Sequence, residues 1–81
     1  MFISEITNDE TIEFHNNVSK NVKKIRQEKK LTQLDVSLAL GFNNPSFVTN
    51  AESPNNDKKF NLTQLHKLSI ILDVDICEFF K

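Results

Sequence analysis

Uncharged polar side chains are concentrated between residues 43 and 50, where five of eight residues are asparagine, serine or threonine. An asparagine amide can pair with an adenine edge through two hydrogen bonds, and a hydroxyl group can bond to several bases or to a phosphate. A short helix that carries such a face would suit the major groove of DNA. The side chains expected to face the bases are Asn43, Asn44, Pro45, Ser46, Phe47, Thr49 and Asn50.

Phe47 leaves two interpretations open. It lies beside Val48, which we expect in the core, so the Phe47 ring should point partly outward. It could contact a thymine methyl group, or it could simply cover the turn that precedes the helix.

Two short helices joined by a turn would have to position these residues. Thr32 followed by Asp35 is a capping pair that predicts a helix start. Gly41 predicts the end of that helix, because glycine readily takes the left-handed conformation that closes one. The second helix is expected from about Pro45 to Glu52, since proline is tolerated in a first turn.

The region before Thr32 predicts helix as well. Apolar residues recur at helical spacing from Ile12 to Ile25, and Thr7 with Glu10 gives a capping pattern. Because Asn16-Asn17 weakens the middle, two alternatives stay open. They are one long helix over about 8–30, or a short helix followed by a main one over 17–30.

The C-terminal third predicts two further helices. Asn61 with Gln64 caps the first, and Asp75 caps a short last one. The expected apolar stripe consists of Leu62, Leu65, Leu68 and Leu72. The fold class is therefore all-α, a five-helix domain over residues 17–81 preceded by an acidic N-terminal extension over residues 1–16. That extension would be an ordered arm or a lengthening of the first helix.

Several of these segments, in this order and at these distances, resemble the Cro/repressor-type helix-turn-helix family of phage repressors and bacterial regulators. The resemblance covers about residues 17–80. Its residues are Ile25-Arg26, Leu31-Thr32-Gln33, Val36-Ser37, Gly41-Phe42, Phe47-Val48, Glu52, Leu65, Leu68 and Val74-Asp75. It implies a compact repressor-like DNA-binding domain whose third helix enters the major groove.

The resemblance also implies roles for four residues. Gln33 would bind a DNA phosphate and support the third helix, and Arg26 and Glu52 would form a structural ion pair between the first and third helices. Ser37 stands where relatives usually have alanine, and its hydroxyl is expected to bond to its own helix backbone. The interval from Gly41 to Glu52 is one residue longer than in the best-known repressors, which shifts the side chains that would meet the bases.

The third helix lacks the arginine that most often reads guanine, since residues 41–53 hold no Arg or Lys. Affinity would then depend on phosphate contacts and on a second copy of the chain. Besides Gln33, the expected phosphate donors are Lys29, Lys30, Lys58 and Lys59, whereas Lys20, Lys23 and Lys24 would be solvated decoration. A homodimer could form through the C-terminal residues Ile76, Phe79 and Phe80 or through the N-terminal arm with Met1, Phe2, Ile3 and Ile6, although Phe79 is expected to close the core.

Composition excludes several other classes of protein. A single cysteine, Cys77, excludes an internal disulfide and a cysteine-rich zinc site, and His15 and His66 lie too far apart to suggest a metal site. No nucleophile–base pair and no glycine-rich phosphate loop are present, so neither an enzyme nor a cofactor is expected. The N-terminus lacks signal-peptide features and no stretch reaches transmembrane length, which favours a cytoplasmic protein.

Double-stranded DNA is thus the expected partner, and the expected function is sequence-specific transcription regulation as a repressor. One alternative is an antitoxin-like or protein-interaction module that keeps the helix-turn-helix fold. Leu34 and Leu38 form an apolar strip outside the usual core positions, which could seat the N-terminal arm or a protein partner.

Overall fold

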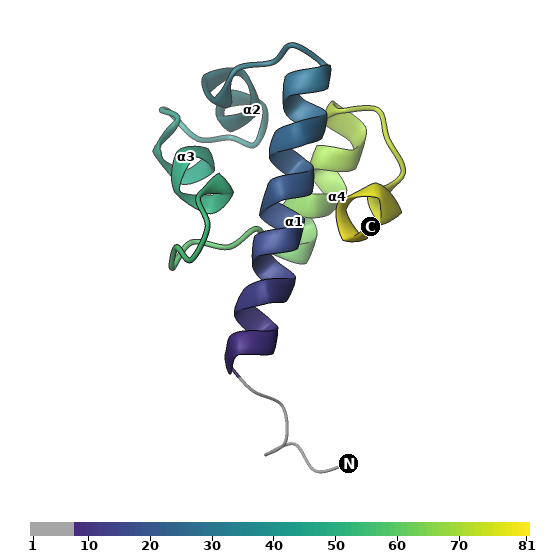
Figure 1. The fold of residues 1–81 in the computed structure, drawn as a ribbon. Coiled ribbons are helices and arrows are strands. Elements are labelled where there is room, and N and C mark those ends of the chain that lie inside the picture. The colour runs from purple at the N-terminus through teal and green to yellow at the C-terminus, as the bar shows by residue number, and fades with distance from the viewer. Residues whose placement is uncertain (1–7) are drawn as a thin grey trace.

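The computed structural model describes residues 8–81, which fold into helices and connecting loops without any strand. The elements are α1 (Asn8–Glu28), α2 (Gln33–Ala39), α3 (Ser46–Glu52), α4 (Leu62–Ile71) and the 3₁₀-helix η2 (Ile76–Phe80). α1 runs through the middle of the molecule, with α2 and α3 on one side and α4 and η2 on the other (Figure 1). The expected arm (Met1, Phe2, Ile3 and Ile6) and the expected cap Thr7 lie outside the described residues.

The all-α class is confirmed, but the expectation of five α-helices is wrong in its last member. Residues 76–80 form a 3₁₀-helix, which suits so short a segment. Asp75 caps it as expected, since its side chain accepts a hydrogen bond from the Cys77 backbone N–H. The element places Phe79 fully inside the core.

α1 is one uninterrupted helix across the two asparagines that made its middle uncertain. Both are held by tertiary hydrogen bonds: Asn16 bonds to Asn55 through side chain and backbone, and Asn17 donates to the Lys81 carbonyl. Asn21, one turn further, donates to the carbonyls of Phe79 and Lys81. These contacts compensate for the low helix propensity of asparagine.

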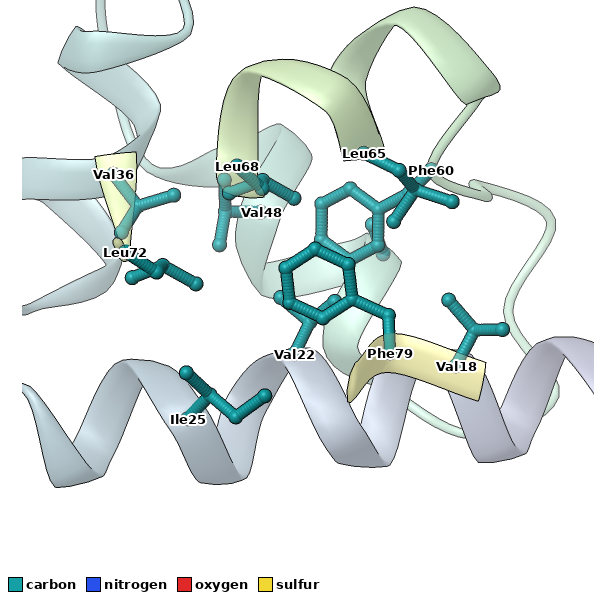
Figure 2. Packing of buried hydrophobic residues seen from close by; sticks show 11 residues of the cluster. Val18, Val22, Ile25, Val36, Val48, Phe60, Leu65, Leu68, Leu72 and Phe79 are labelled. Atoms are coloured by element: carbon teal, nitrogen blue, oxygen red, sulfur yellow. The ribbon is translucent and has the colours of Figure 1, made fainter. Parts of the chain in front are cut away.

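The core lies between α1 and the other elements (Figure 2). α1 directs Val18, Val22 and Ile25 toward side chains from all other helices. The remaining members of the buried cluster are Val36, Val48, Ala51, Phe60, Leu65, Leu68, Leu72 and Phe79. A single apolar core of this size is what a domain of this length can form.

The capping signals at α2 and α4 are confirmed as complete capping boxes. The Thr32 hydroxyl accepts from the Asp35 N–H while the Asp35 carboxylate accepts from the Thr32 N–H. Asn61 and Gln64 make the equivalent pair at α4. Each box satisfies two backbone donors that a helix start otherwise leaves unpaired.

One residue of the expected apolar stripe on α4 is wrongly placed. Leu62 is 72% exposed, whereas Leu65, Leu68 and Leu72 are buried. The buried residue at this end of the helix is Phe60, which directly precedes the cap Asn61. A residue at that position commonly packs against the fourth helical residue, here Leu65, and both belong to the core cluster.

Candidate nucleic-acid interface

α2 and α3 are joined by a turn that contains the only glycine of the chain. Gly41 has φ +97°, a conformation that other residues adopt at a cost in energy. The backbone N–H groups of Gly41 and Phe42 donate to the carbonyls of Leu38 and Ser37, which closes α2. The turn thereby sets the direction in which the chain enters α3.

The end of α3 is fixed to α1 by a buried ion pair. Arg26 Nε lies 2.7 Å from Glu52 Oε2, and Arg26 Nη2 lies 2.9 Å from Glu52 Oε1. The third guanidinium position donates to the Leu31 carbonyl over 2.7 Å. This is the ion pair implied by the family resemblance, and its two-pronged geometry restricts both translation and rotation of α3.

Gln33 extends this ion pair to the start of α2 and to the outer side of α3. Its Nε2 donates to Glu52 Oε1 over 3.0 Å, and its Oε1 accepts from the Thr49 hydroxyl over 2.7 Å. The side chain is half-buried and therefore serves first as a connector between the two helices. One amide hydrogen of Gln33 has no partner among the described residues, because Nε2 carries two donors and uses one.

The two ends of α3 are built differently. Val48 and Ala51 are fully buried and Glu52 is nearly so, which anchors the second half of the helix. At the first residue, the Asn44 carboxamide oxygen accepts from the Ser46 N–H over 2.9 Å, while Pro45 occupies the cap position without a side-chain bond. The role of Asn44 in starting α3 was missed from the sequence.

The remaining polar residues of the expected base-reading set are exposed. Asn43, Ser46, Thr49 and Asn50 all reach solvent, and no residue of the described chain hydrogen-bonds to the side chains of Asn43 or Asn50. Thr49 has used its hydroxyl hydrogen on Gln33 but can still accept. Asn43 and Asn50 are thus the side chains with the most unused hydrogen-bonding capacity on this surface.

Phe47 packs inward, against two other aromatic rings and the core. Its ring stacks on Phe42 at a centroid distance of 4.8 Å and meets Phe60 edge-on at 5.9 Å. It also packs against the core cluster. Of the two interpretations left open by the sequence, this geometry favours the one in which Phe47 covers the turn. Phe42 is half-buried in this stack rather than in the core.

Three of the four lysines expected to donate to phosphates are exposed, and one is half-buried. Lys29 and Lys30 are exposed in the turn between α1 and α2, where Lys30 takes φ 59°. Lys58 is exposed in the loop after α3. Lys59 differs, because it is half-buried and its ammonium donates to the Asn56 carbonyl.

Ser37 contradicts the expectation that its hydroxyl bonds to its own helix. The residue is fully buried, and its hydroxyl has no hydrogen-bond partner among residues 8–81. A buried hydroxyl without a partner lowers stability, since it loses its bonds to water. Ser19 on α1 is the contrasting case, because its hydroxyl donates to the Ala51 carbonyl over 2.6 Å.

The described residues offer no metal site built from three histidine, cysteine or acidic side chains. Cys77 is exposed, and its hydrogen bond with Asp75 raises the pKa of the thiol, which disfavours the reactive thiolate. From Asn8 onward, no helix combines the length and apolar character needed to cross a bilayer.

Comparison with known families and with curated proteins finds no match to this chain.

Proposed function

We propose that this chain is a sequence-specific DNA-binding transcription regulator that acts as a repressor. α3 would lie in the major groove, and the start of α2 would face the phosphate backbone, as in other helix-turn-helix proteins. Two copies would bind a roughly palindromic site and occlude a promoter. A cytoplasmic location belongs to the same proposal.

The observation that carries this proposal is the hydrogen-bonded chain Arg26–Glu52–Gln33–Thr49. It joins α1, the start of α2 and one side of α3 through bonds of 2.7–3.0 Å. A base-reading helix needs such preorganisation, because a displacement of about 1 Å would break its hydrogen bonds to base edges. The network fixes α3 through Glu52 and Thr49 and does not involve Asn43 or Asn50, which are exposed to solvent.

Phosphate binding would come from the start of α2 and from nearby lysines. A helix start already favours anions through its free N–H groups, and Gln33 adds its spare amide hydrogen. Lys29, Lys30 and Lys58 are exposed and could each contact a phosphate. Because one copy offers so few contacts, tight binding would require two copies, with a strong dependence on salt.

Fluorescence anisotropy tests the proposal. The protein is titrated against the duplex upstream of its own gene and against a scrambled duplex at several salt concentrations. A specific regulator should prefer its own duplex by on the order of a thousandfold. If the operator lies elsewhere in the genome, the protein can instead be used to select bound sequences from a pool of random duplexes. Absence of binding in both experiments at low salt would refute the DNA-binding function.

A second candidate, an antitoxin-like or protein-interaction module, rests on a different observation. Leu34 and Leu38 are 44% and 54% exposed on α2, four residues apart and therefore on one side. Replacing both by serine should abolish binding of a protein partner and spare DNA binding. Replacing Asn43 and Asn50 by alanine should have the opposite effect.

A further inference from the structure

The solvent-facing side of α1 carries charge of opposite sign at its two ends. Asp9, Glu13, Lys20 and Lys24 follow one another at spacings of four, seven and four residues, which places them on one side of the helix. All four are exposed, and no salt bridge within residues 8–81 engages any of them. We refer to this side as the dipolar face of α1.

Neither the helix dipole nor the spacing of these four charges explains this arrangement within one chain. The helix dipole favours an acidic residue in the first turn, but its influence fades within that turn, so it accounts for Asp9 and not for Glu13, Lys20 or Lys24. Two pairs of like charge, Asp9 with Glu13 and Lys20 with Lys24, instead stand four residues apart. Such pairs destabilise an isolated helix slightly.

The charges are complementary when two α1 helices run antiparallel. Counting outward from the point between Asn16 and Asn17, Glu13 lies as far on one side as Lys20 lies on the other, and Asp9 as far as Lys24. Glu10 and Lys23 are also equidistant. A two-fold axis at this point would therefore place each acidic residue level with a lysine of the second copy.

The shape of the molecule agrees with this pairing. The first turns of α1 project beyond the other helices (Figure 1), and residues 8–14 are exposed, with the Phe14 ring stacked on that of Phe80. Further along, Lys20, Lys23 and Lys24 line one side of an open cleft of about 500 Å³, with Glu52 and Pro54 on the other. Each copy thus offers an exposed acidic helix end and a cleft lined by lysines.

We infer that a second copy of this chain docks antiparallel on the dipolar face of α1, with the acidic end of each α1 in the lysine-lined cleft of the other. The inference rests on the proposed function in one respect: tight DNA binding requires a second copy, and the inference says where that copy docks. Two helices that pack in this way lie about 8–10 Å apart, within reach of glutamate and lysine side chains. The pairs nearest the two-fold axis are Glu13 of one copy with Lys20 of the other. One such pair lies on each side of the axis.

Sedimentation equilibrium without DNA tests the inference, so its failure is separate from failure of the proposed function. A reducing agent is included, because the exposed Cys77 could otherwise link two chains. Glu13→Lys or Lys20→Glu alone should raise the dimer dissociation constant by on the order of tenfold or more, since each change acts twice in a two-fold dimer. The double variant should restore the wild-type constant, because it exchanges the two charges.

Lys67→Glu on α4 is the matched control, an exposed lysine away from α1 with the same change in charge. It should leave dimerisation unchanged, and circular dichroism should show equal helicity in all variants. Raising the salt concentration should weaken the wild-type dimer. A wild-type chain that stays monomeric at low salt overturns the inference, as does a dimer that the single changes leave intact or the double change fails to restore.

Discussion

The guanidinium group of Arg26 and the carboxylate of Glu52 meet through two hydrogen bonds of 2.7 and 2.9 Å, with both side chains buried. They join the middle helix to the last residue of α3, across 26 positions of sequence. Buried charges are stable only when both partners are present, because each alone would lose its hydration without compensation. This pair therefore determines the position of α3 more than it adds net stability.

Glu52→Gln should lower the free energy of unfolding by about 3 kcal/mol or more, because it leaves the Arg26 charge buried without its partner. Urea denaturation followed by circular dichroism measures the change. Glu28→Gln at the exposed end of α1 is the matched control and should stay within about 0.5 kcal/mol of the wild type. Equal effects of the two substitutions would contradict the role assigned to the pair.

Ser37→Ala should stabilise the protein by about 1 kcal/mol, since it removes a buried hydroxyl that lacks a partner. Ser19→Ala should have the opposite sign and cost about 1 kcal/mol or more, because its hydroxyl donates to the Ala51 carbonyl. Both serines are buried in helices, so the two variants control for each other. Thermal melts of both decide the matter, and a loss of stability in Ser37→Ala would show that its hydroxyl is satisfied.

Asn50→Ala should reduce the preference for the specific duplex, at a cost of about 1–3 kcal/mol, if its amide reads a base. Lys58→Ala should weaken binding to all duplexes alike and lower the salt slope by about 1, since a phosphate contact carries no sequence information. Anisotropy titrations with specific and scrambled duplexes separate these effects. A uniform loss in Asn50→Ala would assign that residue to the backbone instead.

The capping box of α2 should weaken in acid, whereas that of α4 should not. The Thr32 backbone N–H, with help from its hydroxyl, holds the pKa of Asp35 below its ordinary value of 3.8. The Asp35 carboxylate therefore adds stability that is complete above the ordinary pKa and is lost as the pH falls through the lower folded value. The gap in Tm between wild type and Asp35→Ala should shrink from about pH 5 downward.

Gln64→Ala is the matched control for this experiment, because Gln64 has the equivalent position in the uncharged capping box of α4. The gap in Tm between wild type and Gln64→Ala should not depend on pH. A gap for Asp35→Ala that stays constant down to about pH 2 would show that the carboxylate is not stabilised by the fold.

Features set by neighbouring residues could be predicted from the sequence. The boxes at Thr32 and Asn61, the cap Asp75 and the left-handed Gly41 all depend on contacts within a few residues. Such contacts leave a pattern in the sequence that is independent of the rest of the fold. The existence of the helices followed from these signals.

Features set by distant residues could not be predicted in the same way. The continuity of α1 depends on Asn55 and Lys81, which bond to asparagines 39 and 64 positions away. Whether Leu62 or Phe60 fills the core depends on the angle at which the loop reaches α4. The connecting role of Gln33 between Glu52 and Thr49 likewise requires α2 and α3 to be in place, 16 to 19 positions apart in the sequence.

The two opposite sides of α3, with the turn before it, separate what keeps the chain folded from what it would recognise. Val48, Ala51 and Glu52 carry the packing, while Asn43, Ser46 and Asn50 add almost nothing to it. Mutations at the exposed positions therefore change the free energy of unfolding little and are seldom removed by selection for a folded chain. A lineage that carries this fold could change its preferred target in single steps, each through a stable intermediate, and duplicated copies could diverge in target while they keep the same architecture.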